Sequence, residues 1–222
     1  MRNPLSDKIV SIPPSGIRKF FDIVNEMEGA ISLGVGEPDF DTPWHIREEG
    51  IYSLEKGRTF YTSNAGLKSL KDEISRYSDK EIMVTVGGSE AIDAAMRAML
   101  NPGDEVLIPQ PSYVSYVPCA VLADGVPVVI ELEEKDHFKL TPEKLLEKIT
   151  DKTKILVLPF PNNPTGAIME RHELEEIAKI VVEKDIFVIS DEIYSELTYT
   201  DNHVTIASFP GMKERTVLIN GF

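Results

Sequence analysis

Between residues 82 and 219 the chain alternates short strand-like runs with longer helix-like segments, and this alternation limits its fold more than any other feature. The strand-like runs are rich in β-branched and other apolar residues, and they lie at 82–86, 105–109, 126–132, 155–158, 186–189 and 216–219. Helix-like segments lie between them, at 89–100, 113–123, 171–183 and from Thr141 onward. Such alternation is typical of βαβ units. The sequence therefore predicts an α/β fold with three α/β/α layers around a mainly parallel sheet.

Ligands of parallel α/β sheets bind outside the carboxyl ends of the strands. Four segments that follow predicted strands carry unusual side chains, and they lie at 87–90, 109–113, 159–166 and 190–194. Because these strand ends meet at one edge of the predicted sheet, we expect a binding site to be built there.

Composition excludes several classes of function. The 222 residues carry a formal net charge of −14, which would repel nucleic acids and anionic membranes. No apolar run approaches the roughly 18–20 residues of a membrane span, and the first residues lack a signal-peptide core. A single cysteine, Cys119, and four histidines without helical ligand spacing argue against a disulfide framework and a metal site. These features predict a soluble, cytoplasmic protein that binds neither nucleic acid nor membrane.

The segment Gly87-Gly88-Ser89-Glu90 joins a predicted strand to a predicted helix. Amides at a helix N-terminus bind phosphate, and Ser89 would add a hydroxyl. An ordinary turn capped by Ser89 is the alternative. The segment is neither a dinucleotide-binding glycine fingerprint nor a P-loop, because no Lys-Ser or Lys-Thr follows its glycines.

The other three segments each allow a structural and a functional interpretation. Asn163 lies between turn-forming prolines, either in a rigid loop or with its amide directed at a ligand. Asp191 is either a helix N-cap or the partner of a cationic ring nitrogen, and Tyr194 could reach the same ligand. Tyr113 either packs in the core or stacks on a planar group. Together, the four segments describe a pocket for a flat, phosphorylated, protonated heterocycle, and pyridoxal 5′-phosphate (PLP) fits that description.

The chain resembles the class I/II aminotransferases, which are fold-type I PLP-dependent enzymes. The resemblance covers nearly the whole chain and rests on motifs in the family's order and spacing, at 34–38, 60–61 with 66–67, 84–90, 102–104 with 111–113, 161–166 and 190–194. It implies a division into residues 1–40, an arm and part of a small domain, and residues 41–222, the N-terminal portion of the PLP-binding large domain.

The resemblance also implies a role for each matching residue of the site. The phosphate would be held by Gly88, Ser89 and Glu90, the ring by Tyr113, its phenolic oxygen by Asn163 and Tyr194, and its nitrogen by Asp191. Of these, Asp191 and Tyr194 are the predicted catalytic residues.

Further residues are implied at the substrate and at the partner subunit. Tyr61 would reach across a homodimer to the partner's phosphate. Val35 and Gly36 would border the substrate carboxylate, with Asn163 beside them.

In the family, the stretch that matches 216–222 is followed at once by Ser-Lys, and that lysine carries the cofactor. The resemblance therefore places the Schiff-base lysine two residues after Phe222, and we expect the chain to be a fragment of a longer polypeptide. The junction at Ser78-Asp79 is also shorter than is usual in the family.

The activity implied is amino-group transfer between an L-amino acid and a 2-oxo acid. One alternative within the fold is a PLP-dependent C–S β-lyase, because the motifs prepare a carbanion without deciding its fate. If the 222 residues were complete, a non-catalytic regulator of the same fold would be the other alternative. A nucleotide-binding Rossmann protein is disfavoured because the glycine fingerprint is missing.

Overall fold

The computed structural model describes residues 4–14, 23, 27, 29, 40–78, 81–199 and 203–221. The chain divides into two compact units, one made of Met1–Ile12 with Val86–Phe222 and the other of Pro13–Thr85. The motif at 34–38 lies outside the described residues.

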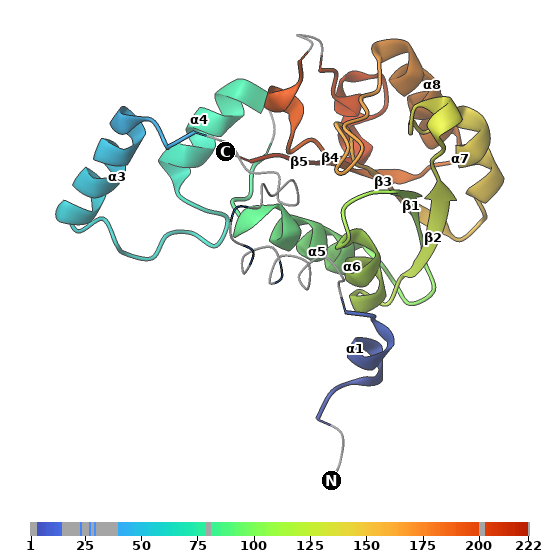
Figure 1. Ribbon diagram of the computed structural model, residues 1–222, viewed down its shortest axis with the longest axis horizontal. Coiled ribbons are helices and arrows are strands. Elements are labelled where there is room, and N and C mark those ends of the chain that lie inside the picture. The colour runs from blue at the N-terminus through green and yellow to red at the C-terminus, as the bar shows by residue number, and fades with distance from the viewer. Residues whose placement is uncertain are drawn as a thin grey trace. The chain divides into compact units, whose positions relative to one another are not determined.

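The larger unit is built on a five-stranded parallel sheet in the order β2-β1-β3-β4-β5 (Figure 1). Its strands are β1 (Glu105–Gln110), β2 (Val126–Glu131), β3 (Thr153–Leu158), β4 (Phe187–Asp191) and β5 (Thr216–Ile219). Leu107 pairs with Val128 on one neighbour and Leu156 on the other, so β1 is an interior strand. The predicted parallel α/β sheet is confirmed.

The strand predicted at 82–86 is wrong, because the described residues 81–86 form no strand. This stretch makes a backbone hydrogen bond from Val84 N to Ala65 O, 3.1 Å long, within the smaller unit. Its β-branched residues match strand propensity, but a strand also needs a neighbouring ladder, and propensity alone does not supply one.

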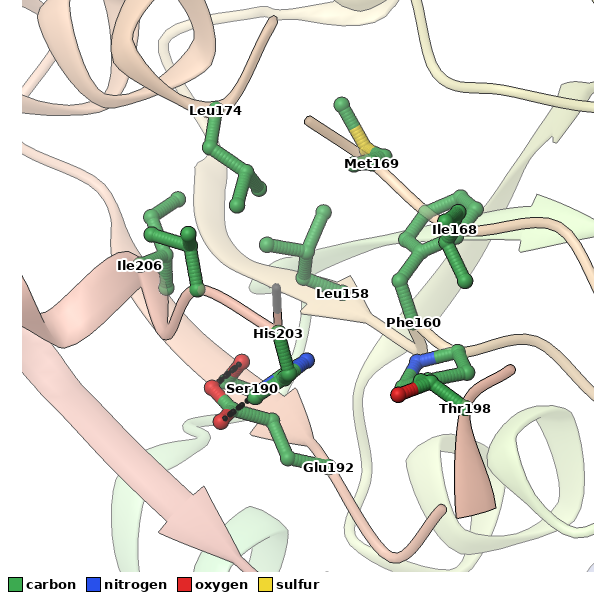
Figure 2. Close-up of a pocket in the computed structure, with 12 residues that line it drawn as sticks. Leu158, Phe160, Ile168, Met169, Leu174, Ser190, Glu192, Thr198, His203 and Ile206 are labelled. Atoms are coloured by element: carbon green, nitrogen blue, oxygen red, sulfur yellow. Dashed lines mark hydrogen bonds and ion pairs between the residues drawn. The ribbon is translucent and has the colours of Figure 1, made fainter. Parts of the chain in front are cut away.

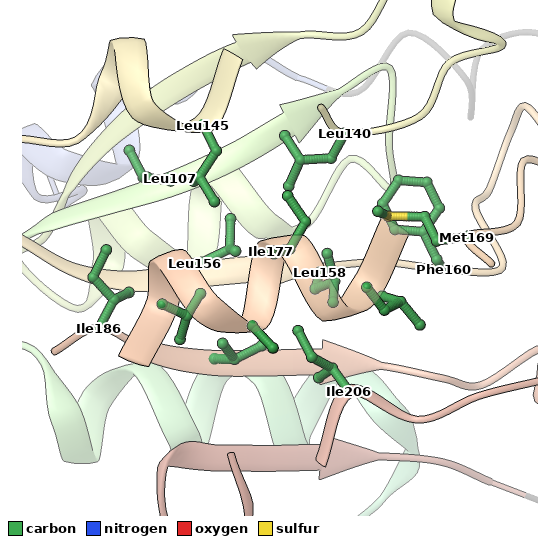
Figure 3. Packing of buried hydrophobic residues seen from close by; sticks show 14 of the residues in the cluster. Leu107, Leu140, Leu145, Leu156, Leu158, Phe160, Met169, Ile177, Ile186 and Ile206 are labelled. Atoms are coloured by element: carbon green, nitrogen blue, oxygen red, sulfur yellow. The ribbon is translucent and has the colours of Figure 1, made fainter. Parts of the chain in front are cut away.

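Alternate residues of β1, β3 and β4 enter two separate cores, which explains the three layers. Leu107, Leu156 and Val188 pack with α7 (Pro142–Lys148) and α8 (Arg171–Glu183) on one face (Figure 3). Their neighbours Val106, Val157 and Ile189 pack with α5 (Gly87–Met99) and α6 (Tyr116–Leu122) on the other face. Side chains along a strand alternate between the two faces of the sheet. A strand that is buried on both faces is therefore apolar at nearly every position.

The helix ends follow local capping chemistry. Thr141 accepts a hydrogen bond from Lys144 N at 3.4 Å, and Pro142 opens α7 as predicted. A capping box between Glu170 and Glu173 begins α8. The helix predicted from 113 begins three residues later, at Tyr116. The larger unit also contains α1 (Asp7–Ser11) and the short 3-10 turns η1 (Glu134–Asp136), η2 (Ser195–Leu197), η3 (Ile206–Ser208) and η4 (Lys213–Arg215).

The smaller unit contains α3 (Trp44–Glu55) and α4 (Lys68–Ser78). No residue of α3 is buried, and Trp44, Ile46 and Leu54 are exposed. Within the described ranges, no helix has the length and apolar character needed to cross a membrane.

Candidate active site

A cavity of about 220 Å³ lies at the carboxyl ends of β1, β3 and β4, against the first turn of α5. All four strand-end segments singled out in the sequence contribute to it. Its walls are formed by Gly88, Ser89, Ile92, Tyr113, Tyr116, Pro159, Pro161, Asn163, Asp191, Ile193 and Tyr194. No lysine, arginine or histidine is among these lining residues of the described chain, and the buried carboxylate of Asp191 faces the cavity.

The first turn of α5 supplies the anion-binding corner of the cavity. Gly87 enters the helix with φ +76°, a conformation that other residues adopt only at a cost, and this brings Gly88 and Ser89 to the cavity wall. The carboxylate of Glu90 turns back to accept a hydrogen bond from Val86 N, and Glu90 is not among the lining residues. Amides of a first helical turn have no partner within the helix and favour an anion.

Asp191 is 7% exposed and is held by two donors. Tyr116 donates from its hydroxyl to Oδ2 at 2.7 Å, and Ile193 N donates to Oδ1 at 3.3 Å. Burial raises the pKa of Asp191 above its ordinary value, while these two hydrogen bonds act in the opposite direction. The contact with Ile193 N closes a local turn, but Asp191 caps no helix, because the N-cap residue of the following turn, Ser195–Leu197, is Tyr194.

Tyr116 is a site residue that the sequence reasoning missed. It is 2% exposed, and burial raises the pKa of its hydroxyl, so this group stays a protonated donor. Its ring meets that of Tyr113 edge-on, with centroids 5.7 Å apart and planes at 83°. The spacing of three residues between the two tyrosines is the signal that could have indicated a shared surface.

Tyr113 also contacts the first turn of α5. Its hydroxyl lies 3.1 Å from Ser89 Oγ, so the aromatic wall and the anion-binding corner touch. Part of the ring remains exposed, which leaves a face for a planar ligand to stack on.

The loop after β3 presents Asn163 at the opposite wall. Its Nδ2 donates to the hydroxyl of Tyr194 at 3.3 Å. The preceding residue, Asn162, is buried, and its Oδ1 accepts hydrogen bonds from Thr165 N and Thr165 Oγ1 at 3.2 and 3.0 Å. This turn fixes the loop, so the amide of Asn163 and the phenol of Tyr194 form one polar pair.

Besides Glu90, three more predicted residues are not among those that line this cavity. Tyr61 belongs to the smaller unit, where its side chain is fully exposed. Val35 and Gly36 lie outside the described residues. A search of the described part of the chain finds no cluster of three metal-ligating side chains.

The donor set fits PLP. It combines an anion-binding helix N-terminus, an aromatic face, an amide with a phenol, and a buried carboxylate that has no cationic partner among the lining residues. Phosphate, planar ring, phenolic oxygen and protonated ring nitrogen each find a matching group.

Known proteins are similar to this chain over its whole length. The family model for class I and II aminotransferases matches residues 28–222. A putative aminotransferase, YugH, of Bacillus subtilis is 50% identical over 100% of this chain and 60% of that protein. An aspartate aminotransferase of Pyrococcus abyssi is 45% identical, covering 98% of this chain and 59% of that protein.

Solved structures agree with these sequence matches. The crystal structure of an aromatic aminotransferase from Pyrococcus horikoshii superposes with a TM-score of 0.84 and 44% identity, covering 93% of this chain and 57% of that one. The chain thus spans about three fifths of the length of its relatives, 60% and 59% for the first two.

Proposed function

Because the chain belongs to the class I and II aminotransferase family, we propose that the whole protein is a PLP-dependent aminotransferase that moves an amino group between an L-amino acid and a 2-oxo acid. The observation that carries this proposal is the buried carboxylate of Asp191, which faces a 220 Å³ cavity and is held by Tyr116. The relatives named above are called aminotransferases, and no observation favours the C–S β-lyase or the regulator.

When bound, PLP supplies a protonated aromatic ring that accepts the electron pair left on the substrate's α-carbon. Asp191 would keep a proton on the ring nitrogen, because a nearby negative charge in a buried site favours the positively charged form of that nitrogen. Tyr116 keeps the carboxylate oriented by donating to Oδ2. A charge-assisted contact of this kind is stronger than a neutral hydrogen bond.

The phosphate would be held by the first turn of α5. Gly88 and Ser89 line the cavity there, and Ser89 Oγ is oriented by the hydroxyl of Tyr113. Glu90 would contribute through its backbone amide, because its carboxylate accepts from Val86 N.

The ring would stack on Tyr113, and its phenolic oxygen would accept hydrogen bonds from Asn163 and Tyr194. These two side chains already contact each other at 3.3 Å, so both donors converge on one position. Two donors at a phenolate stabilise its negative charge.

We assign the remaining roles by family resemblance. Val35 and Gly36 would border the substrate carboxylate together with Asn163, and Tyr61 would reach the partner's phosphate in a homodimer. The exposed apolar side chains of α3 support such a dimer, since large apolar surfaces are usually covered. The free, buried thiol of Cys119, the one cysteine of these 222 residues, supports a reducing compartment such as the cytoplasm.

The test is turnover by the protein expressed from its full reading frame. Aspartate and aromatic amino acids are the first donors to examine, since similar proteins are named for them. We expect product only when a 2-oxo acid acceptor is present. Keto-acid release without an acceptor would instead identify the lyase.

A further inference from the structure

Asp191 and Glu192 are neighbours in the chain, yet they face opposite sides of the sheet. Asp191 lines the large cavity on the side of α5. Glu192 lines a second cavity of about 20 Å³ on the face of the sheet that α7 and α8 cover. Leu158, Leu174 and Ile206 of that core also line it (Figure 2). The alternation of side chains along β4 continues one residue beyond Asp191, the last residue of that strand, which accounts for this separation.

Glu192 is 3% exposed, and both of its carboxylate oxygens have partners. Ser190 Oγ donates to Oε1 at 2.8 Å, and Thr205 Oγ1 donates to the same oxygen at 2.7 Å. His203 Nε2 lies 2.7 Å from Oε2. A buried carboxylate in apolar surroundings is costly unless it is paired, and these contacts offset that cost.

The contacts of Glu192 hold the backbone next to Asp191 in place. The N–H of Glu192 donates to Ile219 O of β5 at 2.8 Å, while its side chain binds Thr205 and His203 from a distant segment. The peptide that joins Asp191 to Glu192 is therefore held at its Glu192 end. The backbone hydrogen bond to β5 and the side-chain contacts of Glu192 both hold it there. Because Ile193 N donates to Asp191 Oδ1, the orientation of that carboxylate depends on the same stretch of backbone.

Glu192 also acts on Asp191 through its charge. Burial is the main cause that raises the pKa of Asp191, and the neighbouring negative charge of Glu192 raises it further. The same negative charge also favours the protonated form of a ring nitrogen bound beside Asp191.

We propose that Glu192, held by Ser190, His203 and Thr205, is a positioning residue that fixes the Asp191 carboxylate for the cofactor ring nitrogen from the opposite face of the sheet. This inference rests on the proposed function. Glu192 does not line the cofactor cavity, so it acts on the ring without touching it.

The experiment compares two ligands that differ only at the ring nitrogen. Pyridoxamine 5′-phosphate and an analogue with C–H in place of that nitrogen are titrated into the apoprotein of the full reading frame. Asp191→Asn should remove most of the wild-type preference for the nitrogen-containing ligand. Glu192→Gln should weaken pyridoxamine 5′-phosphate about five- to tenfold and the analogue less than about twofold. The control is Glu176→Gln, an exposed carboxylate of α8 that should change neither constant.

A second variant keeps the proposal testable if Glu192→Gln does not fold. Ser190→Ala removes a single donor to Glu192 and should shift the preference in the same direction by a smaller factor. Equal weakening of both ligands in both variants, or unchanged constants, would show that the network serves stability alone and would overturn the inference. If the wild-type protein binds neither ligand, the proposed function itself fails.

Discussion

The hydroxyl of Tyr116 donates a 2.7 Å hydrogen bond to Oδ2 of Asp191, and both side chains are buried at the wall of one cavity. This bond links a helix on one face of the sheet to the end of β4. It gives the carboxylate a fixed direction before any ligand arrives, so little reorganisation is needed when a cationic ring nitrogen binds.

Tyr116→Phe should weaken the site without disrupting the fold. The change leaves a buried carboxylate oxygen without its donor, which costs about 1–3 kcal/mol in unfolding free energy. Urea denaturation of the apoprotein measures this loss, and titration with pyridoxamine 5′-phosphate should show weaker binding. Tyr199→Phe, at a fully exposed ring, is the control and should change neither value.

The pH dependence of binding should move in a defined direction in the same variant. The hydrogen bond from Tyr116 lowers the pKa of Asp191 against the larger effect of burial, so its removal raises that pKa further. Pairing with the ring nitrogen needs the ionised carboxylate. As the solution is acidified, affinity for pyridoxamine 5′-phosphate should therefore fall at a higher pH in Tyr116→Phe than in wild type. A fall that begins at lower pH would contradict this account.

Asp191→Asn should stabilise the apoprotein at neutral pH even though it impairs the site. Folding raises the pKa of this acid, so ionisation opposes folding. The penalty is absent below the unfolded pKa and is complete once the pH has risen through the folded pKa. We expect a gain of about 1 kcal/mol at neutral pH that shrinks in acid, as functional groups often carry such a cost. Unfolding in urea at both pH values checks it, and a loss of stability at neutral pH would count against a functional role.

Ser89→Ala separates the phosphate corner from the rest of the pocket. The hydroxyl lines the cavity beside the amides of α5, so its loss should weaken pyridoxamine 5′-phosphate about tenfold. Binding of pyridoxamine, which has no phosphate, should be unchanged. Ser69→Ala, at an exposed serine of α4, is the matched control. An equal effect on both ligands would place the phosphate elsewhere.

Much of the fold and of the site follows from local sequence. Runs such as 155–158 could be predicted as strands because they are buried on both faces and therefore apolar throughout. Asn163 and Asp191 could be grouped because parallel strands end at one edge of the sheet. Ser89 is grouped with them only through a predicted strand at 82–86 that the structure does not form.

Other features depend on contacts that no local pattern contains. Glu192 is bound by His203 and Thr205, which belong to the segment after η2. They lie 11 and 13 residues from Glu192 along the chain. The run 82–86 has strand propensity but no neighbouring ladder. The role of Tyr116 depends on how α6 packs against the sheet at the cavity, which no local pattern around this residue shows.

The most direct test of the central claim is the stoichiometry of a single half-reaction. PLP-loaded protein from the full reading frame is mixed with an amino acid donor in the absence of any 2-oxo acid acceptor, and the 2-oxo acid released is counted. An aminotransferase should release at most one equivalent per site and should resume turnover only when an acceptor is added. Release of many equivalents without an acceptor, or of none with any donor that binds, would contradict the account.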